Sequence, residues 1–150
     1  MSLGQLSLGL VLGLSAIGSA IGIGTVGQAA AGAWAKEARA GKPLSFTYVI
    51  LIGLPLSQTI YGAILMLIGL QPMVYDAAVV AEHGWALLGI AAGGGIAELF
   101  SAWFQGRIGA AACRALVEGE GQGFVFMIIA MGIAETVGLF AFVFLLMVQP

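Results

Sequence analysis

The chain has 150 residues, of which 61% are hydrophobic and only 8% are charged, and its mean hydropathy is +1.08. One soluble core cannot bury that much apolar side chain, so the composition indicates an integral membrane protein. The net charge of −2 leaves no basic surface to neutralise phosphates, which argues against a nucleic-acid-binding protein.

Four segments are long and apolar enough to cross the roughly 30 Å hydrocarbon core of a bilayer as helices. They cover approximately residues 6–34, 45–70, 85–116 and 123–148, and they predict an all-α membrane protein with four transmembrane helices. The expected connections are residues 36–43, 71–84 and 117–122. We interpret the first segment as a retained helix, because no basic leader or small-residue cleavage site accompanies it.

The first segment is rich in glycine, and so is the third, which contains three consecutive glycines at 93–95. Small residues three or four positions apart let transmembrane helices approach closely. The second and fourth segments are rich in Leu, Ile, Phe and Met instead. We therefore expect an inner layer of thin helices and an outer layer of bulky helices that face lipid.

The basic residues all lie near the two short connections: Lys36, Arg39, Lys42, Arg107 and Arg114. The positive-inside rule then puts both short loops in the cytoplasm. The two termini and the middle connection are expected on the opposite side of the membrane.

The second segment carries a polar face. Four of its residues follow the i, i+3, i+4, i+7 spacing of one helix face: Leu54, Ser57, Gln58 and Tyr61. Pro55 lies beside this face and cannot donate a backbone hydrogen bond. It predicts a local distortion that turns a carbonyl, by proline geometry that of Leu51, toward the face.

The third segment contributes Gln105, which is as far from the turn at Glu120 as Glu135 is on the fourth segment. Residues equidistant from a hairpin turn lie at one depth, so these two side chains are expected to meet. Glu98 lies two helical turns before Gln105, and we favour contact with water or a ring lumen for it. A second protonatable group on an ion path is the alternative. Cys113 is interpreted as a small apolar packing residue.

Glu135 is the one charged residue between positions 123 and 148. A carboxylate at the bilayer centre costs roughly 2.5–3.5 kcal/mol on insertion scales, so it usually handles an ion. Its expected neighbours offer only oxygen ligands, which hard cations prefer, and a single negative charge suits a monovalent ion. We predict sodium, with a proton as the alternative, because a proton does not need several converging oxygens. The structural alternative is a permanently protonated Glu135 that only forms a hydrogen bond to a neighbouring helix.

An internal repeat appears when the sequence is compared with itself at an offset of 77 residues. Gln28 then aligns with Gln105, and Glu135 aligns with Gln58. The chain therefore divides into two tandem helical hairpins of the same orientation, residues 1–74 and 75–150. The first hairpin has Gln58 where the second has its carboxylate.

The sequence resembles the proteolipid ring subunit, called K or c, of rotary V-type and V/A-type ATPases. The resemblance covers essentially the whole chain and rests on the glycine-rich stretch 18–24 and on residues 54–61, 100–106 and 134–136. In sodium-pumping members it implies a set of Na⁺ ligands: the Leu54 carbonyl, Ser57, Gln58, Gln105 and Glu135. Tyr61 is implied as a hydrogen-bond donor to the carboxylate.

The resemblance also implies the setting of the chain. Identical copies would form a closed ring in membrane lipid, beside a stator membrane subunit that supplies an arginine, and central-stalk subunits would bind to the ring. Such a chain is an integral multi-pass membrane protein, in the cell membrane if prokaryotic. It has no phosphate-binding loop, so we expect no catalysis by the chain itself. The alternatives are a proton-carrying ring, a stand-alone oligomeric channel and a purely structural membrane protein.

Overall fold

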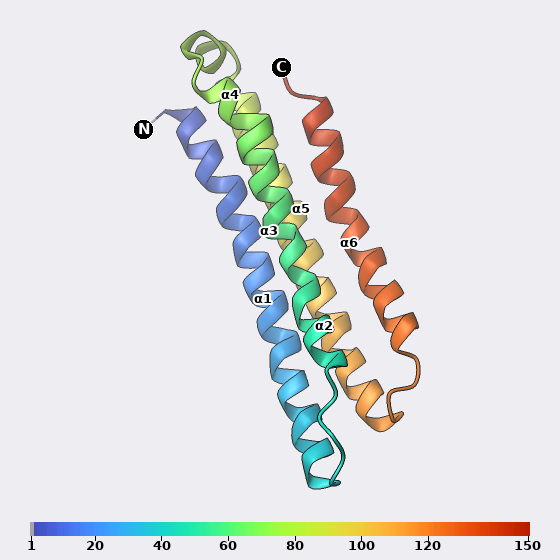
Figure 1. Ribbon diagram of the computed structural model, residues 1–150. Helices are drawn as coiled ribbons and strands as arrows, with labels where there is room; N and C mark the ends of the chain where they lie inside the picture. Colours follow the sequence, from blue (N-terminus) through green and yellow to red (C-terminus); the bar gives the residue numbers. More distant parts are fainter. Residues whose placement is uncertain (1) are drawn as a thin grey trace.

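The computed structural model describes residues 2–150, and these residues form helices and no β-strand. Four helical spans run side by side, and the N- and C-termini lie at the same end (Figure 1). The spans are α1 (Leu3–Arg39); α2 (Thr47–Gly53) with η1 (Leu54–Leu56), α3 (Ser57–Ile64), η2 (Leu65–Leu70) and α4 (Gln71–Val74); α5 (Ala77–Glu118); and α6 (Phe124–Met147). Within the described residues, all four are long and apolar enough to cross a membrane, as predicted.

The connection between the second and third spans is much shorter than the predicted 71–84. The turn consists of Tyr75 and Asp76 alone, because the Asp76 carboxylate accepts hydrogen bonds from the backbone N–H groups of Ala78 and Val79 and so caps α5. Glu82 lies on an exposed helical turn. The charged residues of this stretch led us to predict a loop, but they lie at the N-cap and in the first turns of the long helix α5.

The closest helix pair is α1 against α5, the two glycine-rich spans. A methyl group at Gly18 would collide with the backbone of Leu99, and one at Gly106 would collide with the backbone of Gly22. Only glycine permits this approach, so the prediction that the thin helices pack together is confirmed. Bulky side chains of α6 remain exposed on the opposite side, where Val125, Phe126 and Ile133 are each at least 65% exposed.

The second span is irregular where the polar face lies. The helix tightens into a 3₁₀ turn, η1, at Pro55, which confirms that this proline distorts the span locally. The turning of the Leu51 carbonyl toward the polar face stays a prediction. The Leu54 carbonyl then accepts the backbone N–H of Ser57. A π-helical turn, η2, follows one turn after Tyr61. Such irregular turns direct side chains away from the positions of an ideal helix.

Two apolar clusters enclose the polar residues from both ends. One contains Tyr48, Leu51 and Met131, and Cys113 lies fully buried in it, as predicted. The other contains Leu65, Leu87 and Ile90. These two apolar clusters separate the polar residues in the middle of the spans from the two ends of the molecule.

Candidate functional site

Three spans meet at the carboxylate of Glu135. Tyr61 on α3 donates its hydroxyl hydrogen to Oε1 of Glu135 at 2.9 Å, and Gln105 on α5 donates from Nε2 to Oε2 at 3.2 Å. Both carboxylate oxygens therefore accept a hydrogen bond from a neutral donor. The predicted meeting of Gln105, Glu135 and Tyr61 is present in the structure.

Gln105 is fully buried, and its amide oxygen accepts no hydrogen bond. Its Nε2 also donates to the carbonyl of Met131 at 3.2 Å, whereas its Oε1 has no hydrogen-bond partner. A buried amide oxygen without a partner costs free energy unless something positive approaches it. This oxygen belongs to the same side chain that binds the carboxylate, so it lies beside Glu135.

A second polar chain runs from the 3₁₀ turn toward α6. The Ser57 hydroxyl lies 3.0 Å from the Leu54 carbonyl and 3.2 Å from Oε1 of Gln58, and its single hydrogen can be donated to one of them at a time. Nε2 of Gln58 donates to Oγ of Ser101 at 3.2 Å. The structure thus groups Leu54, Ser57 and Gln58, with Ser101 as their contact on α5.

Ser101 is a member of the site that the sequence patterns did not lead us to expect. Its hydroxyl donates to the carbonyl of Ala134 at 2.9 Å, next to Glu135 along α6. Ser101 lies four residues before Gln105 on α5, and residues four apart share a helix face. That spacing is the signal that identifies it.

The two groups of polar residues remain separate in one respect. In the part of the chain that the structure describes, no hydrogen bond joins Ser57 or Gln58 directly to Glu135. They are adjacent through consecutive turns of the second span, since Gln58 and Tyr61 are three residues apart. In residues 2–150 no three His, Cys, Asp or Glu side chains lie close enough together to hold a metal ion. The hydrogen-bond partners of the Glu135 carboxylate are neutral groups.

Glu98 does not lie where we expected it. It is 1% exposed within the protein, and neither of its carboxylate oxygens has a hydrogen-bond partner. Its Oε2 lies only 2.5 Å from the position that a Cβ at Gly138 would take. The prediction of contact with water or a lumen is wrong, because the missing side chain at Gly138 leaves room for a carboxyl group between α5 and α6.

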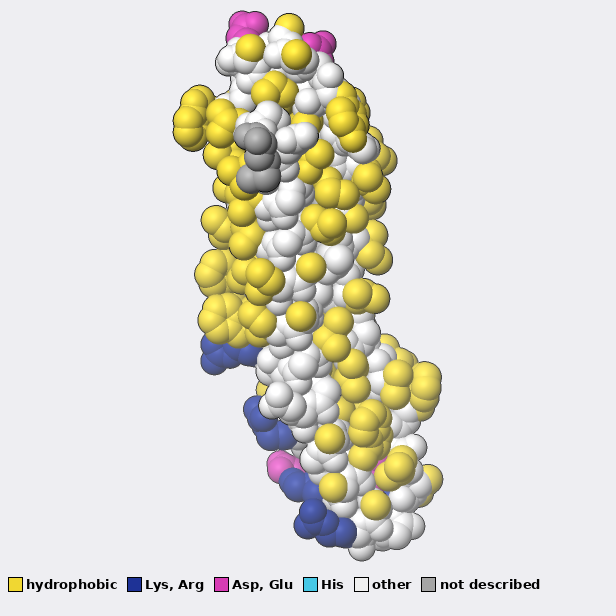
Figure 2. All heavy atoms as spheres, turned by 90° about the vertical axis from the view of Figure 1, so that its left-hand side faces the viewer, with side chains coloured by type: hydrophobic (Ala, Val, Ile, Leu, Met, Phe, Trp, Pro, Cys, Tyr) yellow, Lys and Arg dark blue, Asp and Glu magenta, His cyan; other side chains and the backbone are white. Residues whose placement is uncertain are grey.

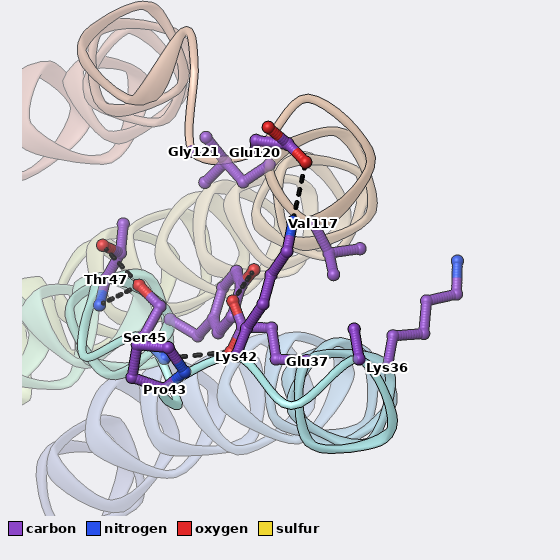
Figure 3. A pocket seen from close by; sticks show the side chains of 12 residues that line it. Lys36, Glu37, Lys42, Pro43, Ser45, Thr47, Val117, Glu120 and Gly121 are labelled. Carbon is purple, nitrogen blue, oxygen red and sulfur yellow. Dashed lines mark hydrogen bonds and ion pairs between the residues drawn. The ribbon is translucent and has the colours of Figure 1, made fainter.

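A hollow lies away from Glu135, at the end formed by the two short loops. It has a volume of about 380 Å³, and Figure 3 shows the side chains that line it. Lys42 reaches across it to Glu120 at 2.7 Å, while the Glu37 carboxylate accepts hydrogen bonds from the Ser45 backbone and the Tyr48 hydroxyl. None of the residues predicted to bind an ion lines this hollow.

The Lys42–Glu120 pair is one of two charged links between the short loops, and Lys36–Glu118 is the other. The hydrogen bond from Lys42 lowers the pKa of Glu120 below its usual value. The pair is therefore intact above the usual pKa of a glutamate and is lost only as the pH falls through the lowered pKa. Because both side chains are exposed, the pair orients the loops more than it stabilises the fold.

Comparison with protein families explains the arrangement. A family model, that of the c subunit of ATP synthase, matches residues 6–69 and again residues 88–148, which together make up most of the chain. The chain belongs to the ATP synthase c-subunit family. Members of this family are ion-translocating components of a membrane rotor ring. No individual curated protein matched the sequence.

Each match to the family model falls within one of the two predicted hairpins. The first match includes Gln58 and the second includes Glu135, so one of the two repeats retains a carboxylate. As a member of the c-subunit family, the protein is a membrane proteolipid whose polar residues lie between its spans, well inside the apolar length of the helices.

Proposed function

We propose that the chain is the rotor-ring subunit of a V-type ATPase, in which each copy carries one sodium ion on Glu135 during ATP-driven transport. Four helices with a carboxylate at only one of two repeat-related positions favour the V-type arrangement, because the repeat places Gln58 at the position of Glu135. Each copy then carries one ion for two hairpins. The chain itself is not a catalyst, and other subunits supply the ATP chemistry.

The observation that carries the sodium proposal is the Gln105 side chain. Its amide nitrogen holds Glu135, and its oxygen is buried without a partner. A proton on Glu135 requires a hydrogen-bond acceptor at most, whereas a cation requires several oxygens. The further ligands that we propose are Ser57, Gln58 and the Leu54 carbonyl. They lie together on the neighbouring span, and Tyr61 holds the carboxylate.

The proposed cycle follows from charge. An ion bound to Glu135 neutralises the carboxylate, and the neutral site can pass through lipid. A bare carboxylate requires a partner, and we propose that it is an arginine of a stator membrane subunit. Movement of one elementary charge across 100 mV exchanges about 2.3 kcal/mol with the membrane potential.

Identical copies are proposed to pack side by side into a closed ring. The surface of α1 has open positions, since an added Cβ at Gly9, Gly13, Gly24 or Gly27 would meet nothing within 4 Å inside the protein. Such positions suit close approach of a neighbouring helix. The basic side chains gather toward one end of the face shown in Figure 2, and we propose that this end faces the cytoplasm and binds the central stalk.

Binding of radioactive sodium to the purified ring tests the proposal. We expect saturable binding of one ion per copy at a pH where Glu135 is ionised, and we expect sodium to protect Glu135 from carbodiimide. Labelling that responds to pH but not to sodium would leave the proton-carrying ring as the function. A monomer or dimer in native mass spectrometry would instead favour a stand-alone channel.

Transport by the Glu135→Gln variant tests the role of the carboxylate. Glutamine keeps the volume and one of the two oxygens that accept from Tyr61 and Gln105, but it removes the charge that binds and releases the cation. We expect the ring to assemble and ATP-driven transport to be lost. The matched control is Glu82→Gln, which removes an exposed acid at the end of α5. Normal transport by rings made wholly of Glu135→Gln would refute the mechanism.

A further inference from the structure

Glu98 is a buried carboxyl group that the proposed cycle does not use. It points between α5 and α6 against Gly138, it is 1% exposed, and both oxygens lack a partner within residues 2–150. Moving a carboxylate out of water costs several kcal/mol unless an opposite charge or strong hydrogen bonds compensate it. The structure offers Glu98 no such hydrogen bond, so its charge must be balanced in another way.

No basic side chain is placed to balance it. The titratable groups close enough to Glu98 to interact with it electrostatically are Tyr61 on α3 and Glu135 on α6. Along α1 there is no charged residue before Lys36. Along α5 the nearest basic residue is Arg107, nine positions away, which is about 13 Å of helix. The charge is therefore removed by a proton or by a mobile cation.

The two carboxyl groups have contrasting surroundings. Glu135 accepts one hydrogen bond on each carboxylate oxygen, from Tyr61 and from Gln105. Glu98 accepts none, so its acid form is favoured. Gly138, which Glu98 contacts, is one helical turn from Glu135, and like charges that close are unfavourable together. A pair of acids in such different settings divides its roles, one charged and one neutral.

We propose that Glu98 is a second ion-binding carboxyl of each copy, which holds a proton while Glu135 carries the transported cation. The cation part of this statement rests on the proposed function, but the proton on Glu98 does not. With Glu98 protonated, a copy loaded with one monovalent cation is neutral at its membrane centre. With Glu98 ionised, the loaded copy would keep one uncompensated charge in the membrane, at a cost of the order that opposes insertion of any charged residue.

The proposal has a consequence for cation affinity. A cation on Glu135 reduces the repulsion between the two carboxyls, so Glu98 loses its proton more readily when the site is loaded. By linkage, an ionised Glu98 strengthens cation binding by the same factor. The sodium affinity of the native ring should therefore rise as the pH rises through the range in which Glu98 loses its proton, and this rise should be absent in Glu98→Gln.

Infrared spectroscopy of the purified ring tests for the proton directly, because a protonated carboxyl group has a carbonyl band well above the carboxylate bands. In the sodium-saturated native ring at neutral pH we expect the band of one buried acid. We expect it to disappear in Glu98→Gln and to persist in Glu135→Gln and in the exposed-acid control Glu82→Gln. Absence of the band from the native ring, or its persistence in Glu98→Gln, would overturn the proposal.

Sodium binding as a function of pH gives the second arm. We expect the ratio of native to Glu98→Gln affinity to grow by about tenfold toward alkaline pH, as one nearby unit charge would cause. A ratio independent of pH would overturn the linkage. If neither ring binds sodium, the sodium function fails. In that case the infrared spectrum should show two protonated carboxyl groups in the native ring and one in Glu98→Gln. Failure of the sodium function and failure of the Glu98 proposal are therefore distinguishable.

Should Glu98→Gln not assemble, Gly138→Ala gives a second test, because its methyl group crowds Oε2 of Glu98. We expect it to shift the carbonyl band of the protonated acid, and an unshifted band would refute the assignment of that band to Glu98.

Discussion

At Glu135 the donors matter as much as the charge. Tyr61 and Gln105 each contribute a single hydrogen bond, and both are neutral, so they orient the carboxylate without neutralising it. A lysine or arginine in either position would form an ion pair and keep a cation out. Neutral donors leave the negative charge available for the cation that we propose Glu135 binds and releases.

The Gln105→Leu variant measures what that glutamine contributes. Leucine removes both the hydrogen bond to Glu135 and the unpartnered amide oxygen, so we expect sodium affinity to fall by roughly tenfold to a hundredfold, the range for losing a hydrogen bond to a charged group. The matched control is Gln28→Leu, the repeat-related glutamine on α1, which is exposed and far from Glu135 in the sequence. Sodium-binding isotherms of the Gln105→Leu and Gln28→Leu rings make the comparison. Equal sodium affinities of the two rings would contradict a ligand role for Gln105.

At the scale of the helices, sequence reasoning predicted most of the site because hairpins have a simple geometry. Equal distance from the turn placed Gln105 beside Glu135, and helical spacing placed Tyr61 on the face that meets them. Glu98 was misplaced because its position depends on Gly138, a residue on another helix whose missing side chain leaves the space. The periodicity of one segment cannot show where a glycine on another helix leaves space for a side chain.

The contact of α1 with α5 predicts a sharp difference between two neighbouring glycines. A methyl group at Gly22 would meet the Ala102 carbonyl oxygen and the Pro55 side chain, whereas one at Gly24 would meet nothing within 4 Å. We expect Gly22→Ala to lower the stability of the protein by about 1–3 kcal/mol, the usual cost of overpacking, or to prevent folding. Gly24→Ala is the control, because it brings the same gain in helix propensity without the collision.

Thermal unfolding of the detergent-solubilised protein, separated from its ring, compares the two variants without contributions from neighbouring copies. A melting temperature that drops in Gly22→Ala and not in Gly24→Ala supports the close packing. Equal melting temperatures would mean that the two helices can separate at little cost, and the polar site between the spans would then not be held by this contact.

At the scale of the whole molecule, the two ends differ in charge. The end formed by the short loops carries Lys36 and Lys42, paired with Glu118 and Glu120, while the other end carries Asp76 without a basic residue nearby in the sequence. The two ion pairs join the first loop to the second across the hairpins. A surface formed jointly by both loops suits the central-stalk subunits that we propose bind the ring.

The sidedness that the positive-inside rule predicts from this charge asymmetry is testable with single cysteines. We expect Cys113, which is fully buried, to be silent, and its replacement by alanine removes any residual reaction. Ala40 is a better reporter of the first loop than Gly41, because Gly41 has φ +67°, which strains any other residue, whereas Ala40 is exposed with φ −82°. Ala77→Cys reports the opposite end, where Ala77 is also exposed.

The positive-inside rule predicts that a membrane-impermeant thiol reagent added outside intact cells modifies Ala77→Cys and reaches Ala40→Cys only after the membrane is opened. The reverse pattern would invert the topology and move the proposed stalk-binding surface to the other side of the membrane, where the ATP-driven subunits could not reach it.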